Sequence, residues 1–192
     1  MLSIGMIGPP VLLQQNQKIF SQQTSFLTQN IHSFPLQNTR QISALDGLLI
    51  TGFHPHDYAR ELFRFRAHLL SRADSLSFFG ICAGASALGK NQLLPLLNCK
   101  TFCEARCSCT TSILEVPCFS RSRFAAFFLP AVHFYETGPN LGILCHHPLR
   151  GPVILRQGDI LVSSYAAEWT PQNEIYDYWL NMVWMLKNSR EN

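Results

Sequence analysis

The chain has 192 residues, of which 47% are hydrophobic and only 14% are charged, and its formal net charge is +3 at pH 7. This length and apolar content predict a single domain over residues 1–192 with a sizeable hydrophobic core. The small, scattered positive charge argues against nucleic-acid binding, and no apolar stretch approaches 18 residues, so we expect no membrane span.

The N-terminal segment, Leu2–Ile7, is predicted to be a first β-strand and not a targeting sequence. No basic residue precedes it, and Pro9-Pro10 would interrupt the apolar core of a signal peptide. The chain also contains seven cysteines, an odd number. Together these features predict reduced thiols and a cytoplasmic location.

Strand-like and helix-like segments alternate along the first half of the chain. Short apolar runs mark the strands, and apolar side chains at helical spacing mark the helices. In chain order we expect a helix at Val11–Leu27, strands at Ile31–Phe34 and Leu45–Thr51, a helix at Tyr58–Leu70 with Asp57 as its N-cap, and a strand at Leu76–Ile81 followed by a turn and a helix before Leu94. This alternation is typical of an α/β fold with a mostly parallel sheet.

Short extended segments dominate the second half, up to a final helix at Glu174–Lys187. We expect strands at Ile113–Cys118, Phe127–Phe134, Leu141–Cys145, Val153–Arg156 and Ile160–Ser164. Gln157-Gly158-Asp159 has the composition of a hairpin turn between the last two. We assign the apolar stripe of the final helix to core packing: Ile175, Tyr178, Trp179, Met182, Val183 and Leu186. The α/β sandwich is therefore predicted to carry a small antiparallel insertion.

The most informative motif is Gly80-Ile81-Cys82-Ala83-Gly84, at the end of an apolar strand. A nucleophile flanked by glycines in this way is typical of a nucleophile elbow, a tight strand-to-helix turn in which larger side chains would clash. Such a turn holds the sulfur of Cys82 above the sheet, and the helix N-terminus beside it favours the thiolate. The alternative is a buried cysteine that serves packing alone.

Four stretches carry a family resemblance: Leu45–Ile50, Phe79–Gly84, Phe128–His133 and Arg156–Val162, the last running on into Glu168 and the helix at Tyr176–Val183. They resemble the class I glutamine amidotransferases, and among these the glutaminase subunit of the ribose-5-phosphate-dependent pyridoxal 5'-phosphate synthase. The resemblance implies a flavodoxin-like sandwich and a role in vitamin B6 biosynthesis. In that family a cysteine attacks the glutamine amide, a histidine activated by a glutamate supplies the proton, and the released ammonia passes to a synthase subunit.

By this resemblance, Cys82 matches the nucleophile and Glu168 matches the orienting acid. The family's His-Pro-Glu is Ala166-Ala167-Glu168 here, so the position of the catalytic histidine carries a methyl group. Loss of the histidine from a nucleophile–base pair lowers turnover on the order of a million-fold. A cysteine suffers less than a serine, since part of it is thiolate at neutral pH, but the leaving ammonia still needs a proton donor.

The loop that the resemblance assigns to the oxyanion and the substrate differs from the family as well. It comprises Gly52, Phe53 and Ala83, and Phe53 replaces the glycine whose N–H the family offers to the oxyanion. One lost oxyanion donor costs about 3 kcal/mol. The family's Arg-Gln segment, which helps to bind glutamine, corresponds to Cys107–Thr110 and contains no arginine. Three altered parts of one site indicate drift after loss of the reaction.

Of the seven histidines, only His54 and His56 lie in the loop that should line the Cys82 pocket. They are therefore the candidate substitute bases, and the alternative is a solvated turn around Pro55. We interpret His133 as structural and assign no role to His146-His147.

The series Cys99, Cys103, Cys107 and Cys109 invites a metal interpretation. Its spacing differs from the paired C-x2-C of structural zinc sites. On a strand, gaps of four residues place side chains on one face, as buried cysteines also do. We predict ordinary small hydrophobic residues, with no metal site and no cofactor.

Two functions remain open. The first is a binding or regulatory subunit that keeps the fold and docks on the synthase subunit without hydrolysing glutamine. The second is a working cysteine amidohydrolase that uses His54 or His56 as a rebuilt base, on glutamine or another substrate. Ala166 and Phe53 favour the first function, whereas Glu168 and the turn at Cys82 favour the second.

Overall fold

The structure, a computed structural model, describes residues 1–22, 30–104, 109–129, 132–170 and 174–191. Within these ranges a seven-stranded sheet occupies the centre of the molecule, in the order β2-β1-β3-β4-β11-β10-β9. Its strands are β1 (Leu2–Ile7), β2 (Ile31–Pro35), β3 (Gly47–Gly52), β4 (Ser77–Cys82), β9 (Gly142–His147), β10 (Gly151–Gln157) and β11 (Ile160–Ser163). The strands from β2 to β11 run parallel, and β10 and β9 continue the sheet antiparallel. The predicted α/β fold with a mostly parallel sheet is confirmed.

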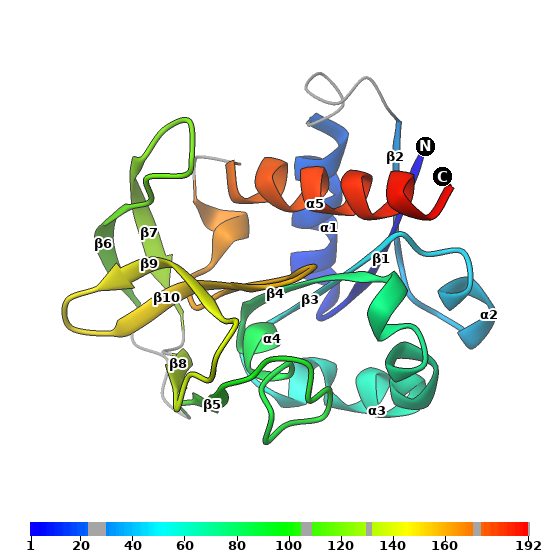
Figure 1. Cartoon of the computed structure of the whole chain (residues 1–192), viewed down its shortest axis with the longest axis horizontal. Helices are drawn as coiled ribbons and strands as arrows, with labels where there is room; N and C mark the ends of the chain where they lie inside the picture. Colours follow the sequence, from blue (N-terminus) through cyan, green and yellow to red (C-terminus); the bar gives the residue numbers. More distant parts are fainter. Residues whose placement is uncertain (23–29, 105–108, 130–131, 171–173, 192) are drawn as a thin grey trace.

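Helices cover both faces of this sheet (Figure 1). On one face lie α1 (Pro10–Gln22) and α5 (Glu174–Glu191), and on the other lie α3 (His56–Leu70) and the short helices α2 (Thr39–Ile42) and α4 (Ala83–Ser86). Because side chains alternate along a strand, β3 contributes to both cores: Leu49 packs with α1 and α5, whereas Leu48 and Ile50 pack with α3. Burial on both faces explains why this strand is apolar along most of its length.

The last helix confirms its predicted role in core packing and runs further than predicted, to Glu191. Four members of the apolar stripe are buried, namely Ile175, Trp179, Met182 and Val183. The indole N–H of Trp179 also donates to Ser77 Oγ at 2.9 Å, at the start of β4. Lys187 Nζ lies 3.0 Å from an Asp46 carboxylate oxygen, which ties the later turns of the helix to the chain just before β3.

The antiparallel insertion consists of two small sheets near β9 and β10 (Figure 1). Strand β5 (Lys100–Cys103) pairs with β8 (Val132–Tyr135), and β6 (Thr110–Glu115) pairs with β7 (Arg123–Phe128). The single strand predicted over Phe127–Phe134 is therefore wrong, since the segment contributes to two strands with different partners. Pro130 and Ala131, between these strands, lie outside the described residues.

Two helix boundaries also differ from the sequence prediction. The helix after Cys82 covers only Ala83–Ser86, and turns follow it. Helix α3 begins at His56 with Pro55 at the N-cap position, so Asp57 is not the N-cap but lies in the first turn. The predicted end of the first helix, Phe26-Leu27, falls outside the described residues.

The hairpin turn at Gly158 is confirmed, with β10 and β11 paired antiparallel on either side and a φ of 55° at the glycine.

Among the described helices, none combines the length and the hydropathy that a bilayer crossing requires.

Candidate active site

The turn at Cys82 has the backbone geometry of a nucleophile elbow. Cys82 ends β4 with φ 51° and ψ −128°, a left-handed conformation that a residue with a side chain seldom adopts, and it is only 2% exposed. A Cβ atom on Gly80 would lie 2.6 Å from Ala85 Cα, and one on Gly84 would overlap the carbonyl oxygen of Ile50. Both glycines are therefore required by close backbone approach.

Helix α3, which covers one face of the sheet, contacts this turn through the side chain of Tyr58. The hydroxyl of Tyr58 donates to the carbonyl oxygen of Ala83 at 2.9 Å, and Ser86 Oγ donates to the same oxygen at 2.7 Å. Burial raises the pKa of Tyr58 to about 12, so the phenol keeps its proton at neutral pH. Two side chains thus hold Ala83, the residue after Cys82.

Ala166 lies in the segment that follows β11, and hydrogen bonds of its backbone N–H and carbonyl oxygen hold it in place. The N–H of Ala166 donates to the Phe127 carbonyl oxygen at 2.7 Å, and its own carbonyl oxygen accepts from Thr170 Oγ1 at 3.1 Å. The residue is 1% exposed. Its methyl side chain offers no proton donor or acceptor.

Glu168 lies two residues further on, in the short 3₁₀ helix η3 (Ala167–Trp169), and its carboxylate is buried. Oε1 accepts a hydrogen bond from Thr51 Oγ1 at 2.5 Å, and the residue after Thr51, Gly52, pairs with Cys82 across β3 and β4. The carboxylate is therefore anchored on the strand next to Cys82. Sequence reasoning missed the Thr51 contact, because the two residues are 117 positions apart in the chain.

The second carboxylate oxygen, Glu168 Oε2, is buried and has no hydrogen-bond partner in the described part of the chain. Burial raises the pKa of Glu168, and the hydrogen bond from Thr51 and the proximity of Asn16 act in the opposite direction with smaller effect. A buried acceptor without a donor is energetically costly.

The carboxylate of Asp57 binds two backbone N–H groups of the loop that follows β3. Asp57 Oδ2 accepts from the N–H of Phe53 at 2.7 Å and from the N–H of His54 at 2.9 Å. The ring of Phe53 meets the indole of Trp169 edge-on, with the ring centroids 6.4 Å apart. The N–H that the resemblance assigns to the oxyanion is thus already engaged by a carboxylate.

The two candidate substitute bases lie at the start of α3. The rings of His54 and His56 stack with centroids 5.2 Å apart, and His56 Nε2 is 3.5 Å from Asp57 Oδ1. The side chain of His56 is 78% exposed, which matches the solvated-turn interpretation for this residue better than contact with the buried Cys82 sulfur.

Three further histidines lie on antiparallel strands, namely His133 on β8 and His146 and His147 on β9. His133 Nε2 is 2.9 Å from Glu104 Oε1, in agreement with a structural role, and His147 Nε2 is 3.1 Å from Ser112 Oγ.

The cysteine series does not lie on one strand face. Cys99 is buried just before β5, Cys103 ends β5 and is partly buried, and Cys109 is exposed just before β6. Burial raises the pKa of the Cys99 thiol to about 11. Cys107 lies outside the described residues, and within them no group of three potential ligands is arranged to hold a metal ion.

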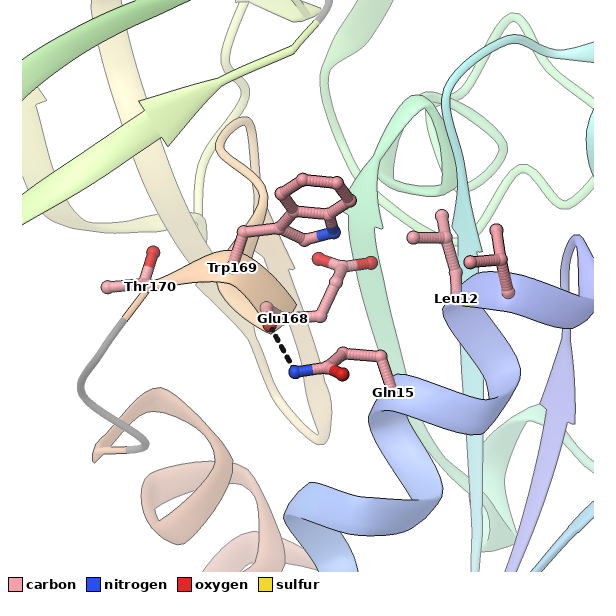
Figure 2. A pocket seen from close by; sticks show the side chains of 6 residues that line it. Leu12, Gln15, Glu168, Trp169 and Thr170 are labelled. Atoms are coloured by element: carbon pink, nitrogen blue, oxygen red, sulfur yellow. Dashed lines mark hydrogen bonds between the residues drawn. The ribbon is translucent and has the colours of Figure 1, made fainter.

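A pocket of about 390 Å³ lies between α1 and the segment that contains Glu168. Its lining residues are Val11, Leu12, Gln15, Glu168, Trp169 and Thr170. Figure 2 shows the Glu168 carboxylate between the indole of Trp169 and the side chain of Leu12. Gln15 Nε2 donates to the backbone oxygen of Glu168 at 3.2 Å and so joins the two walls. Sequence reasoning did not find this pocket, because its walls are far apart in the chain.

No family model matches the chain. Curated proteins similar to it include pyridoxal 5'-phosphate synthase subunits PdxT from several bacteria. The PdxT of Thermosipho africanus is 28% identical over 160 residues, which are 77% of this chain and 84% of that protein. The PdxT proteins of Thermotoga neapolitana and Francisella philomiragia are 29% and 33% identical over 57% and 54% of this chain. These two alignments span only 63% and 58% of the relatives' own length.

Solved structures with the same fold include glutamine amidotransferases. One of them superposes with a TM-score of 0.79 at 20% identity and covers 94% of this chain and 98% of its own. A glutamine amidotransferase from Thermotoga maritima gives a TM-score of 0.60 at 11% identity, with 100% of this chain and 86% of that chain covered. The strand order, the turn at Cys82 and these similarities lead to one conclusion: the chain is a class I glutamine amidotransferase-like protein that resembles PdxT.

Proposed function

We propose that the chain is a glutaminase-subunit homologue of the pyridoxal 5'-phosphate synthase that no longer hydrolyses glutamine efficiently and acts as a binding or regulatory subunit. The observation that carries the proposal is Ala166. By resemblance to the family, this position holds the imidazole that moves a proton between the nucleophile and the leaving ammonia. A methyl group neither accepts the thiol proton nor protonates the amine.

The contact between Phe53 and Asp57 supports the same proposal. A tetrahedral intermediate formed at Cys82 carries negative charge on oxygen, which needs N–H donors aimed at it. The Phe53 N–H instead donates to the Asp57 carboxylate at 2.7 Å. An oxyanion at this position would compete for that donor and would meet a second negative charge.

The environment of Glu168 agrees with a change of role. In the family this carboxylate orients the histidine, whereas here one oxygen accepts from Thr51 and links the segment after β11 to β3. We infer that Glu168 now serves the fold of this wall and not proton transfer.

The proposed partner is the synthase subunit, because the PdxT relatives are named as subunits of pyridoxal 5'-phosphate synthase. Glutamine is the expected substrate only if activity remains. The odd number of cysteines supports a cytoplasmic protein with reduced thiols.

The test is a glutamine hydrolysis assay with two readouts, glutamate and ammonia, on the pure chain with and without the synthase subunit. Binding of the two proteins is measured in parallel by isothermal titration calorimetry. The proposal expects binding to the synthase subunit together with hydrolysis no faster than that of the Cys82→Ala variant.

Two results would contradict the proposal. Hydrolysis that the Cys82→Ala substitution abolishes would establish a working amidohydrolase, and the His54→Ala and His56→Ala variants would then identify its base. Absence of binding to the synthase subunit would remove the proposed regulatory role.

A further inference from the structure

The pocket between α1 and η3 combines three features that do not depend on glutamine hydrolysis: a buried carboxylate oxygen, an aromatic wall and an apolar rim. Its volume of about 390 Å³ is within the range of small-molecule sites. It also lies where α1 follows β1 and η3 follows β11, at the carboxyl edge of the parallel strands. In open α/β sheets, ligands bind at this edge.

The charge of the pocket favours a cation. Among the described residues that line it, Glu168 alone is ionisable, and none of them is basic. The backbone N–H groups of Leu12 and Leu13, in the first turn of α1, both donate to the Pro9 carbonyl oxygen and are not available to an anion. A negatively charged ligand would therefore be repelled by the Glu168 carboxylate and would have few N–H groups to bind.

The hydrogen-bonding state of Glu168 requires a donor. Oε1 is satisfied by Thr51, whereas Oε2 is buried without a partner within the described residues. A charge-assisted hydrogen bond from an ammonium group is among the strongest that a carboxylate accepts. The indole of Trp169 borders the same space (Figure 2), and an aromatic face attracts an organic cation.

We propose that this pocket binds a small organic ammonium ion, with the amine on Glu168 Oε2 and the apolar part of the ligand against Trp169 and Val11. The side chain of Trp169 lines the same pocket and is 52% exposed. Fluorescence of this indole therefore reports binding.

The experiment titrates the full chain with benzylammonium, and with benzyl alcohol as an uncharged ligand of similar shape, using tryptophan fluorescence and calorimetry. Saturable one-to-one binding of benzylammonium is expected, with benzyl alcohol at least about tenfold weaker. The Glu168→Gln variant should lose about tenfold or more in affinity for the cation. A Trp184→Phe variant, altered at an exposed tryptophan on α5, should retain the fluorescence response.

A second pair of variants tests the charge of the site without changing a buried residue. Val11 is 59% exposed at the rim, so both substitutions there are compatible with the fold. Val11→Lys should weaken benzylammonium binding about tenfold through repulsion, whereas Val11→Gln should leave it nearly unchanged. The inference is wrong if benzylammonium does not saturate, if benzyl alcohol binds equally well, or if both Glu168→Gln and Val11→Lys keep the original affinity.

Discussion

The two sides of the candidate site differ in what they retain. On the side of β4 and α4, the backbone keeps the full geometry of a nucleophile elbow, with Cys82 at φ 51°. On the side of the β11–η3 segment, the fold persists but position 166 carries a methyl group, and in the loop after β3 the Phe53 N–H is engaged by Asp57. Under the proposed function, the first side keeps groups that the fold needs, and the second side lacks groups that only the reaction would need.

Packing by itself accounts for both glycines of the turn at Cys82. A side chain on Gly84 would overlap the Ile50 carbonyl oxygen, and one on Gly80 would press on Ala85. Packing alone therefore preserves these glycines, so an intact turn is weak evidence for activity. An imidazole at position 166 has no such protection, because the backbone of that segment is held by hydrogen bonds that a methyl-bearing residue also makes.

The largest effect is expected for Gly84→Ala, which tests whether packing holds the elbow. The new methyl group would meet the backbone of β3, which has no room to move in the sheet. We expect a loss of about 3 kcal/mol or more in the free energy of unfolding, measured by urea titration. Gly142→Ala is the matched control, because its nearest atom lies 3.5 Å from the added Cβ. Equal stability of the two variants would refute the packing explanation.

A smaller effect is expected for Asp57→Ala, which removes the acceptor for the N–H groups of Phe53 and His54. The loss of two backbone hydrogen bonds at the start of α3 should cost about 1–2 kcal/mol. Thermal unfolding followed by circular dichroism measures it, with Glu61→Gln on the exposed side of the same helix as the control. An unchanged midpoint would mean that Asp57 does not hold this loop.

The pH dependence of stability tests the burial of Glu168. Its folded pKa is raised, chiefly by burial, so protonation favours the folded state. This contribution is present below the pKa of the carboxyl group in the unfolded chain and is lost as the pH rises through the folded pKa.

Wild type should therefore lose stability relative to Glu168→Gln as the pH rises from about 4, the range of an ordinary carboxyl pKa, through the raised folded pKa. Asn16, Thr51 and Tyr176 pack around the carboxylate and are the same in both proteins. Parallel stability profiles of the two proteins would show that Glu168 is not buried as described.

The smallest effect on stability is expected for His56→Ala. Its ring stacks on that of His54, and its side chain is 78% exposed. The substitution should change the free energy of unfolding by less than about 0.5 kcal/mol, and both His56→Ala and His54→Ala should leave glutamine hydrolysis at its background level. A Cys82-dependent rate that either substitution abolishes would instead favour the rebuilt amidohydrolase.

The sequence predicts most of the fold because the strands are short apolar runs. The two longest helices, α3 and α5, also have clear apolar stripes. It fails where tertiary contacts decide. Aspartate is a residue type favoured at N-caps, but Pro55 occupies the N-cap position of α3. The carboxylate of Asp57 instead accepts a hydrogen bond from the N–H of Phe53 in the preceding loop. The strand predicted over Phe127–Phe134 divides between two partners, which no local pattern reveals.

The candidate site follows the same rule. Cys82, Ala166 and Glu168 are identified by motif, because each lies in a stretch that resembles the family. The bond from Thr51 to Glu168 joins residues 117 positions apart, and the pocket joins α1 to η3. Such contacts depend on the packing of the sheet and not on local sequence.

The central claim is tested most directly by restoring the missing groups. The double variant Ala166→His and Phe53→Gly, mixed with the synthase subunit, should release glutamate from glutamine at least about a hundredfold faster than wild type. That gain should disappear when Cys82→Ala is added. If wild type already shows Cys82-dependent hydrolysis as fast as the double variant, the methyl group at position 166 is not what silences this site.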